Sequence, residues 1–181
     1  YEANTISILE SAQIQEPTRT SPTALPLASL DPYERVYALH LFTGLLRVIQ
    51  ITDQKSIRTE FNVRLEEDEI RDIQILDEPS ELLLGVIYSK KTEFVLKVYS
   101  IKLQGYSMEE TTWVYKFQHS TCKIISSPGK VGVLHEAGVV VYDLQTGNPM
   151  SFNAHLKEVT SCNKVDSNRW ILGNTNGEIY L

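Results

Sequence analysis

Apolar and polar residues alternate along much of the chain, and the alternating runs come in pairs separated by short polar turns. A period of two residues predicts strands with one buried face, and a tight turn between two such runs predicts a hairpin. Four hairpins are expected on this basis, at 36–51, 82–101, 131–144 and 169–181, with turns at 43–44, 89–92, 136–138 and 174–177.

The predicted turns recur at intervals of roughly 40 to 50 residues, which is typical of propeller blades built from four strands each. Further strands are expected between the hairpins, at 61–65, 70–76, 111–117, 122–126 and 159–165. A helix over 64–76 is the alternative there, but the β-branched residues Ile70, Ile73 and Ile75 favour a loop followed by a strand. The expected fold is therefore all-β, a partial β-propeller of about four antiparallel blades within a single domain, 1–181.

One segment, 10–26, departs from this pattern because it combines three prolines with several threonines and few large apolar residues. It is expected to be a long surface loop, a common place for binding residues on a rigid β scaffold. Both ends of the sequence are expected to fall inside blades, since 5–9 resembles an outgoing strand and Leu181 ends a strand in mid-run.

Composition narrows the possible functions. The formal net charge is −6 and no run of basic residues occurs, so direct binding to nucleic acid by this chain is not expected. The apolar runs are far shorter than the roughly 20 residues needed to span a bilayer. Cys122 and Cys162 belong to no zinc-binding spacing, and two cysteines are too few for a disulfide framework, which fits a reducing compartment.

No catalytic, metal or cofactor site is expected from the motifs. Glu66–Glu69 with Asp72 lacks the alternating spacing and the glycine of a calcium loop and is interpreted as a solvated turn. Residues 173–177 precede a strand rather than a helix, which indicates a hairpin turn and not a phosphate loop. The histidines and cysteines are interpreted as packed or surface residues, and three acidic residues near turns share no repeated spacing: His40, His119, His135, His155, Cys122, Cys162, Asp143, Asp166 and Glu178.

Three stretches carry a specific resemblance. They are 31–49, which begins Asp31-Pro32-Tyr33-Glu34-Arg35, then 61–67, then 165–181 with Arg169-Trp170-Ile171-Leu172-Gly173. Together, and in this order, they resemble the first propeller of the large subunit of the UV-damaged DNA-binding protein. The resemblance runs over nearly the whole chain and is looser between these stretches.

This resemblance implies a parent protein with three seven-bladed propellers that acts as the adaptor of a cullin-four RING ubiquitin ligase in the nucleus and cytoplasm. The first and third propellers would grip substrate receptors, including the subunit that recognises DNA damage, while the middle propeller holds the cullin. Arg19, with Thr20 and Ser21 beside it, matches the loop that meets receptors, although the family's other arginines are missing. Arg64, Glu66 and Glu67 match a family string for which a structural role is expected.

Two other functions stay open on the sequence alone. The large subunit of the polyadenylation cleavage factor and a splicing-factor subunit share the Asp-Pro and blade pattern, which would place the chain in an RNA-processing complex. An unrelated propeller hydrolase is the third alternative, because residues distant in sequence can meet at the mouth of a propeller.

Overall fold

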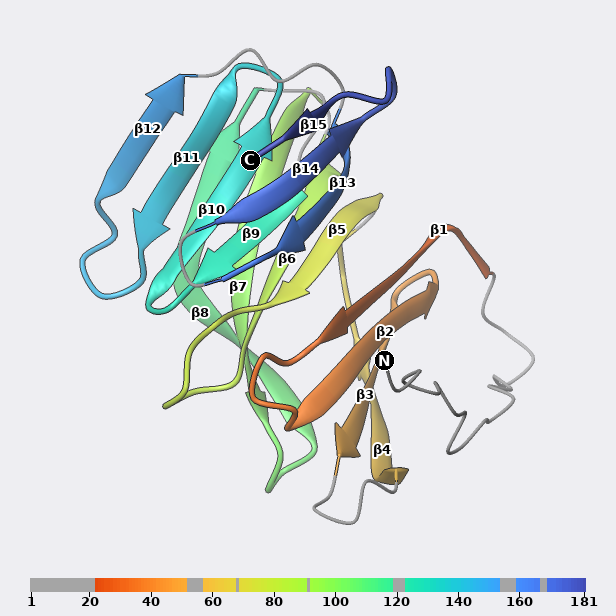
Figure 1. The fold of residues 1–181 in the computed structure, drawn as a ribbon. Helices are drawn as coiled ribbons and strands as arrows, with labels where there is room; N and C mark the ends of the chain where they lie inside the picture. Colours follow the sequence, from red (N-terminus) through yellow and green to blue (C-terminus); the bar gives the residue numbers. More distant parts are fainter. Residues whose placement is uncertain are drawn as a thin grey trace, which may run out of the picture.

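The computed structural model describes residues 22–51, 57–67, 69–90, 92–118, 123–153, 159–166 and 169–181, with only the backbone described at 22–24, 57 and 58. These residues form fifteen strands in four antiparallel sheets, each in chain order (Figure 1). The first sheet holds β1 (Pro22–Leu30), β2 (Val36–Phe42), β3 (Leu45–Ile51) and β4 (Ile57–Arg64). The second holds β5 (Ile70–Ile75), β6 (Leu83–Lys90), β7 (Glu93–Lys102) and β8 (Ser107–Phe117). The third holds β9 (Lys123–Ser127), β10 (Lys130–His135), β11 (Gly138–Asp143) and β12 (Pro149–Asn153). The fourth holds β13 (Val159–Lys164), β14 (Trp170–Asn174) and β15 (Ile179–Tyr180).

The four sheets stand side by side as successive blades, which confirms the expected partial β-propeller (Figure 1). The first strands of the first three sheets contact one another, with β1 against β5 and β5 against β9. The described residues include no helix, and so none that could cross a membrane.

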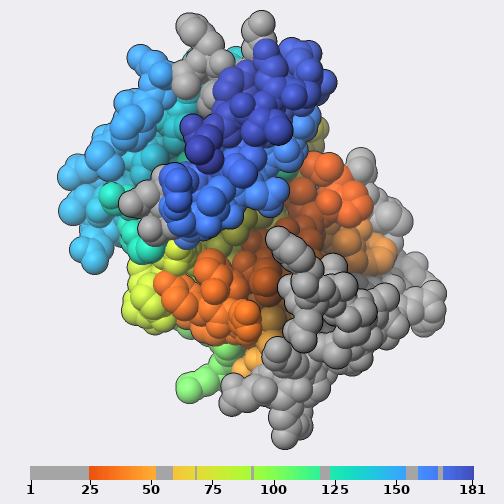
Figure 2. Space-filling view, in the orientation of Figure 1, coloured from red at the N-terminus to blue at the C-terminus, as the bar shows by residue number. Residues whose placement is uncertain are grey.

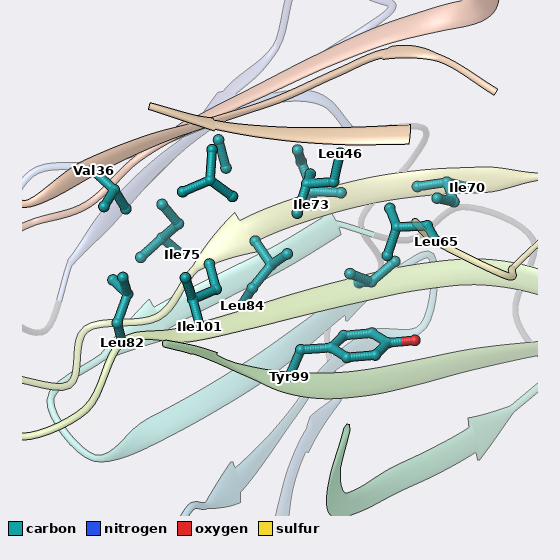
Figure 3. Packing of buried hydrophobic residues seen from close by; sticks show 13 residues of the cluster. Val36, Leu46, Leu65, Ile70, Ile73, Ile75, Leu82, Leu84, Tyr99 and Ile101 are labelled. Atoms are coloured by element: carbon teal, nitrogen blue, oxygen red, sulfur yellow. The ribbon is translucent and has the colours of Figure 1, made fainter. Parts of the chain in front are cut away.

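Three apolar clusters hold the blades together, one at each junction between neighbouring sheets. The first cluster lies between the first two blades and includes Val36, Leu46, Ile75 and Leu84, all fully buried (Figure 3). Strand β7 contributes to two junctions, because Tyr99 and Ile101 belong to the first cluster while Leu96 and Val98 belong to the second. Successive side chains of such a strand therefore point alternately toward the blade on one side and the blade on the other. Both sets of positions are apolar because both faces of the strand are buried.

Most predicted strands are confirmed, and two details are corrected. The hairpin turn expected at 89–92 is tighter, because β6 continues to Lys90 and β7 begins at Glu93. The strand β12 was not predicted, since its five residues are all exposed and show no apolar alternation. The choice of loop then strand over a helix at 64–76 is confirmed.

The predicted surface loop 10–26 is wrong at its C-terminal end, because 22–26 belong to β1. Pro22 and Pro26 are tolerated there because β1 is an edge strand among the described strands, paired with β2, and the register shifts between Pro22 and Leu27. The rest of that loop, and the strand expected at 5–9, lie outside the described residues.

Candidate interaction surface

The four blades meet at one end at a single residue, Asp77, which is only 5% exposed. The Tyr33 hydroxyl donates to Asp77 Oδ1 at 2.8 Å, and the Lys164 ammonium forms an ion pair with Oδ2. The backbone N–H of Asp77 donates to Ser126 Oγ at 2.5 Å. Because Tyr33, Asp77, Ser126 and Lys164 come from the first, second, third and fourth sheets, one residue ties together all four blades.

The Asp31–Arg35 motif that carried the resemblance forms the turn between β1 and β2 and is held by its own ion pair. Arg35 Nε donates to Asp31 Oδ2 at 2.7 Å and Nη2 donates to Oδ1 at 3.1 Å, a bidentate geometry in which Asp31 is fully buried. The same guanidinium donates to the carbonyl oxygens of Glu78 and Pro79, at 3.0 and 3.2 Å. The motif therefore fixes the turn of the first blade against that of the second.

Behind these turns lies a hollow of about 190 Å³, lined by Pro32, Gln74, Ile124, Ile125, Ser126, Cys162, Asn163, Lys164 and Trp170. Burial raises the pKa of the Cys162 thiol to about 11. The thiol therefore stays protonated at neutral pH and is a weak nucleophile. This agrees with the interpretation of Cys162 as a packed residue, while Cys122 lies outside the described residues.

The acidic segment after β4 was interpreted as a solvated turn, and this is wrong for Glu67. Glu67 is 9% exposed, and its Oε1 accepts from the Tyr99 hydroxyl and from Lys97 Nζ, the latter at 2.9 Å. Burial acts to raise the pKa of Glu67, but the hydrogen bonds from Tyr99 and Lys97 lower it more. The net pKa therefore lies below the ordinary value for a glutamate. Glu67 thus anchors the connection between the first two blades, the structural role that the resemblance implied, whereas Arg64 and Glu66 are exposed.

Asp72 is the second acidic residue that the sequence interpretation placed wrongly in solvent. Its Oδ2 accepts from the backbone N–H of Ile124 at 2.7 Å, and its Oδ1 lies 3.4 Å from Lys123 Nζ. Burial raises the pKa of Asp72, against the opposing effect of Lys123. Asp72 therefore joins β5 of the second blade to β9 of the third. The period of two alone does not identify such residues, because an acidic residue that bridges blades occupies the same alternating position as a solvated one.

The described histidines have packing roles. His40 is buried on β2, and neither ring nitrogen has a hydrogen-bond partner among the described residues. Desolvation lowers its pKa. His135 Nδ1 accepts from the backbone N–H of Ala137 at 3.2 Å, within the β10–β11 turn. His119 and His155 lie outside the described residues, and among the residues that are described no His, Cys, Asp and Glu side chains converge as a metal site.

The glycine and asparagine segment 173–177 is a hairpin turn, as expected, and Gly177 has a φ of 78°. Gly173 and Asn174 are the last two residues of β14, just before this turn. A Cβ at Gly173 would lie 2.6 Å from Ser161 Oγ on β13, so a side chain there would have to displace this hydroxyl. The side chain of Asn174 accepts from the backbone N–H groups of Asn176 and Glu178, which closes the turn.

The residues predicted to meet receptors, Arg19, Thr20 and Ser21, lie outside the described residues. Asp77, Tyr33 and Lys164 were not singled out from sequence as a group. Tyr33 stood only in a stretch that carried the resemblance and Lys164 in a predicted strand, and only the fold brings them to Asp77, 44 and 87 residues away along the chain.

Comparisons with known proteins find no protein-family model that matches the chain. Several curated proteins do match. DNA damage-binding proteins 1a and 1b of Arabidopsis thaliana are each 26% identical over 157 residues, covering 84% of this chain. DNA damage-binding protein 1 of Schizosaccharomyces pombe is 29% identical over 124 residues, covering 61% of this chain.

The aligned part makes up only 14% of each Arabidopsis protein and 12% of the Schizosaccharomyces pombe protein. The resemblance found in the sequence is nevertheless confirmed: over most of its length this chain is similar to curated proteins named DNA damage-binding protein 1.

Proposed function

We propose that this chain is a protein-binding scaffold in the cellular response to DNA damage, and that it forms part of the adaptor that brings substrate receptors to a cullin-four RING ubiquitin ligase. The observation that carries the proposal is the similarity over 84% of the chain to proteins named DNA damage-binding protein 1. The blade architecture supports it, because a propeller presents rigid turns at both ends on which binding residues can be displayed. The proposed location is the nucleus and cytoplasm.

Receptor binding is assigned to Arg19, Thr20 and Ser21 by the resemblance. The planar guanidinium of Arg19 can donate two parallel hydrogen bonds to a carboxylate or several to backbone carbonyls, which suits it as an anchor for a partner. Binding by shape and hydrogen bonds needs no bond-making step, so we propose no enzymatic activity, cofactor or metal for this chain.

The first test is the identity of the large partner that co-purifies with the tagged full-length protein. A cullin with substrate receptors is the expected result. Recovery of polyadenylation or splicing factors in place of the cullin would overturn the proposal and support an RNA-processing subunit.

The second test replaces one residue in the same protein. Arg19→Glu is expected to weaken receptor recovery while leaving cullin recovery intact. Lys116→Glu is the matched control, because it makes the same charge change at an exposed position on β8 whose ammonium lies 3.6 Å from Glu93. Equal receptor recovery by the two variants would remove Arg19 from the interface.

A further inference from the structure

Three large apolar side chains are exposed on the segments that meet at Asp77. Leu30, Tyr33 and Val165 are 50%, 43% and 49% exposed. Tyr33 and Lys164, the neighbour of Val165, bind the two oxygens of the same Asp77 carboxylate, so these segments adjoin although they come from the first and fourth blades. Figure 2 shows the orange β1–β2 segment and the blue fourth blade on one face of the molecule, on either side of a hollow. We call residues 30–35, 77–81, 164–166 and Arg169 the hub surface.

The hub surface has an excess of negative charge. It carries six acidic and three basic residues, which are Asp31, Glu34, Asp77, Glu78, Glu81 and Asp166, and Arg35, Lys164 and Arg169. Each base is already paired with a carboxylate, Arg35 with Asp31, Lys164 with Asp77 and Arg169 with Asp166. Three carboxylates, those of Glu34, Glu78 and Glu81, form no ion pair with a basic residue of the hub surface. Lys130, the first residue of β10 after the neighbouring turn, carries a further positive charge, which acts on Asp143.

The backbone that presents these groups is fixed before any partner arrives. Glu34 has a φ of 55°, a left-handed conformation that is uncommon for a residue other than glycine, and its N–H donates to the Asp31 carbonyl at 2.9 Å. The next residue, Arg35, is fixed by its guanidinium, which donates to the Asp31 carboxylate and to the Glu78 carbonyl in the β5–β6 turn. Strained residues that the surrounding contacts hold in place tend to occur at binding sites, and a rigid site loses little entropy when it binds.

We propose that the hub surface binds a short segment of a protein partner in which basic side chains flank apolar ones. The apolar residues of the partner would cover Tyr33, Leu30 and Val165, and its cations would lie against Glu34, Glu78 and Glu81. A partly exposed tyrosine whose hydroxyl is already bonded offers a large contact area with little conformational freedom to lose, which is the character of interface hot spots. The inference uses neither Arg19 nor the proposed ligase role and stands or falls separately from both.

The test is a titration of the full-length protein against two fluorescein-labelled peptides, followed by fluorescence anisotropy. One peptide has the sequence Arg-Lys-Leu-Leu-Arg-Lys, and the other is its charge-reversed counterpart Glu-Asp-Leu-Leu-Glu-Asp. The basic peptide is expected to bind at least about tenfold more tightly, and its affinity is expected to fall with rising salt, because exposed charges are screened. Equal binding of the two peptides, or binding of neither, would overturn the proposal.

Variants then locate the site. Tyr33→Ala is expected to weaken binding of the basic peptide about tenfold, while Tyr33→Phe, which keeps the ring and loses only the hydroxyl bond to Asp77, is expected to weaken it less. The double variant Glu34→Asn with Glu81→Gln is expected to weaken binding about fivefold, since asparagine tolerates the left-handed backbone at position 34.

The matched control is Glu66→Gln with Glu109→Gln, which makes the same charge change at two exposed positions outside the hub surface. It is expected to leave the affinity for the basic peptide unchanged. If the control double variant weakens binding as much as the hub double variant, the attraction comes from net charge alone and the hub surface is not the site. Since all four glutamates are exposed, neither double variant is expected to alter folding.

Discussion

Removal of the Glu67 carboxylate tests whether the acidic segment after β4 is structural. The side chains of Glu67 and Lys97 are 6% and 13% exposed, and the Tyr99 hydroxyl also depends on Glu67 as its acceptor. Figure 3 shows the Tyr99 ring at the margin of the cluster between the first two blades, so the network lies against this core. Among the described residues, Glu67→Ala would leave the buried Lys97 ammonium with Glu110 as its remaining carboxylate partner, whose side chain is 63% exposed.

Breaking a buried pair by removing one partner costs about 3–5 kcal/mol, whereas an exposed pair contributes about 0–1 kcal/mol. Because Glu110 compensates part of the charge of Lys97, we expect Glu67→Ala to lower the free energy of unfolding by about 3 kcal/mol. Urea unfolding measures this loss, with Glu66→Ala as the control at an exposed neighbour that should change stability by less than about 0.5 kcal/mol. Similar midpoints for the two variants would show that Glu67 is solvated and refute the reasoning.

The same network predicts the sign of a pH effect. The pKa of Glu67 lies below its ordinary value of 4.5 in the folded protein, so the unfolded chain binds more protons as the solution is acidified. The stability that Glu67 contributes is fully present above pH 4.5 and is lost as the pH falls from there through the lowered pKa. Glu67→Gln should flatten the stability profile in that acid range and leave its slope near neutral pH unchanged.

Three further perturbations follow from the packing. Gly132→Ala should lower the free energy of unfolding by about 1–3 kcal/mol in urea, because its Cβ would lie 2.6 Å from Ile125 Cγ1, and a loss below about 0.5 kcal/mol would contradict this contact. His40, whose pKa burial lowers, should make the protein less stable as the pH falls below about 6.5, and His40→Phe should reduce that slope between pH 5 and 7. Tyr115→Phe removes a buried hydroxyl without a partner among the described residues and should leave the melting temperature unchanged or raise it, so a clear decrease would reveal a bond to that hydroxyl.

The hairpins could be predicted from sequence because each depends on local chemistry. The turn at Gly44 needs a positive φ, here 74°, and the apolar runs on either side are long enough to define two strands. β1 was partly missed because its prolines argue against a strand, and only the fold shows that it lies at the edge of the described strands of its sheet, where prolines are tolerated. β12 was missed because it pairs with β11 without burying a side chain, so no apolar pattern records it.

The candidate surface could be predicted only in part. The Asp31–Arg35 motif was recognised, but its function as a brace between two blades depends on carbonyl groups of Glu78 and Pro79 that no local pattern identifies. Glu67 and Asp72 were assigned to solvent because acidic residues are rarely buried unless they are paired. Their partners lie 30 and 51 residues further along the chain, at Lys97 and Lys123, and only the packing of successive blades brings them together.

The central claim is that successive sheets stand side by side so that residues of the second and fourth blades meet at Asp77. A double-mutant cycle in urea with Asp77→Asn and Lys164→Met tests this most directly, because the two positions are 87 residues apart in sequence. We predict a coupling energy of about 0.5–2 kcal/mol, since directly paired residues are not additive while distant ones are. Additive effects, with a coupling indistinguishable from zero, would mean that the two blades do not meet there and would contradict the account.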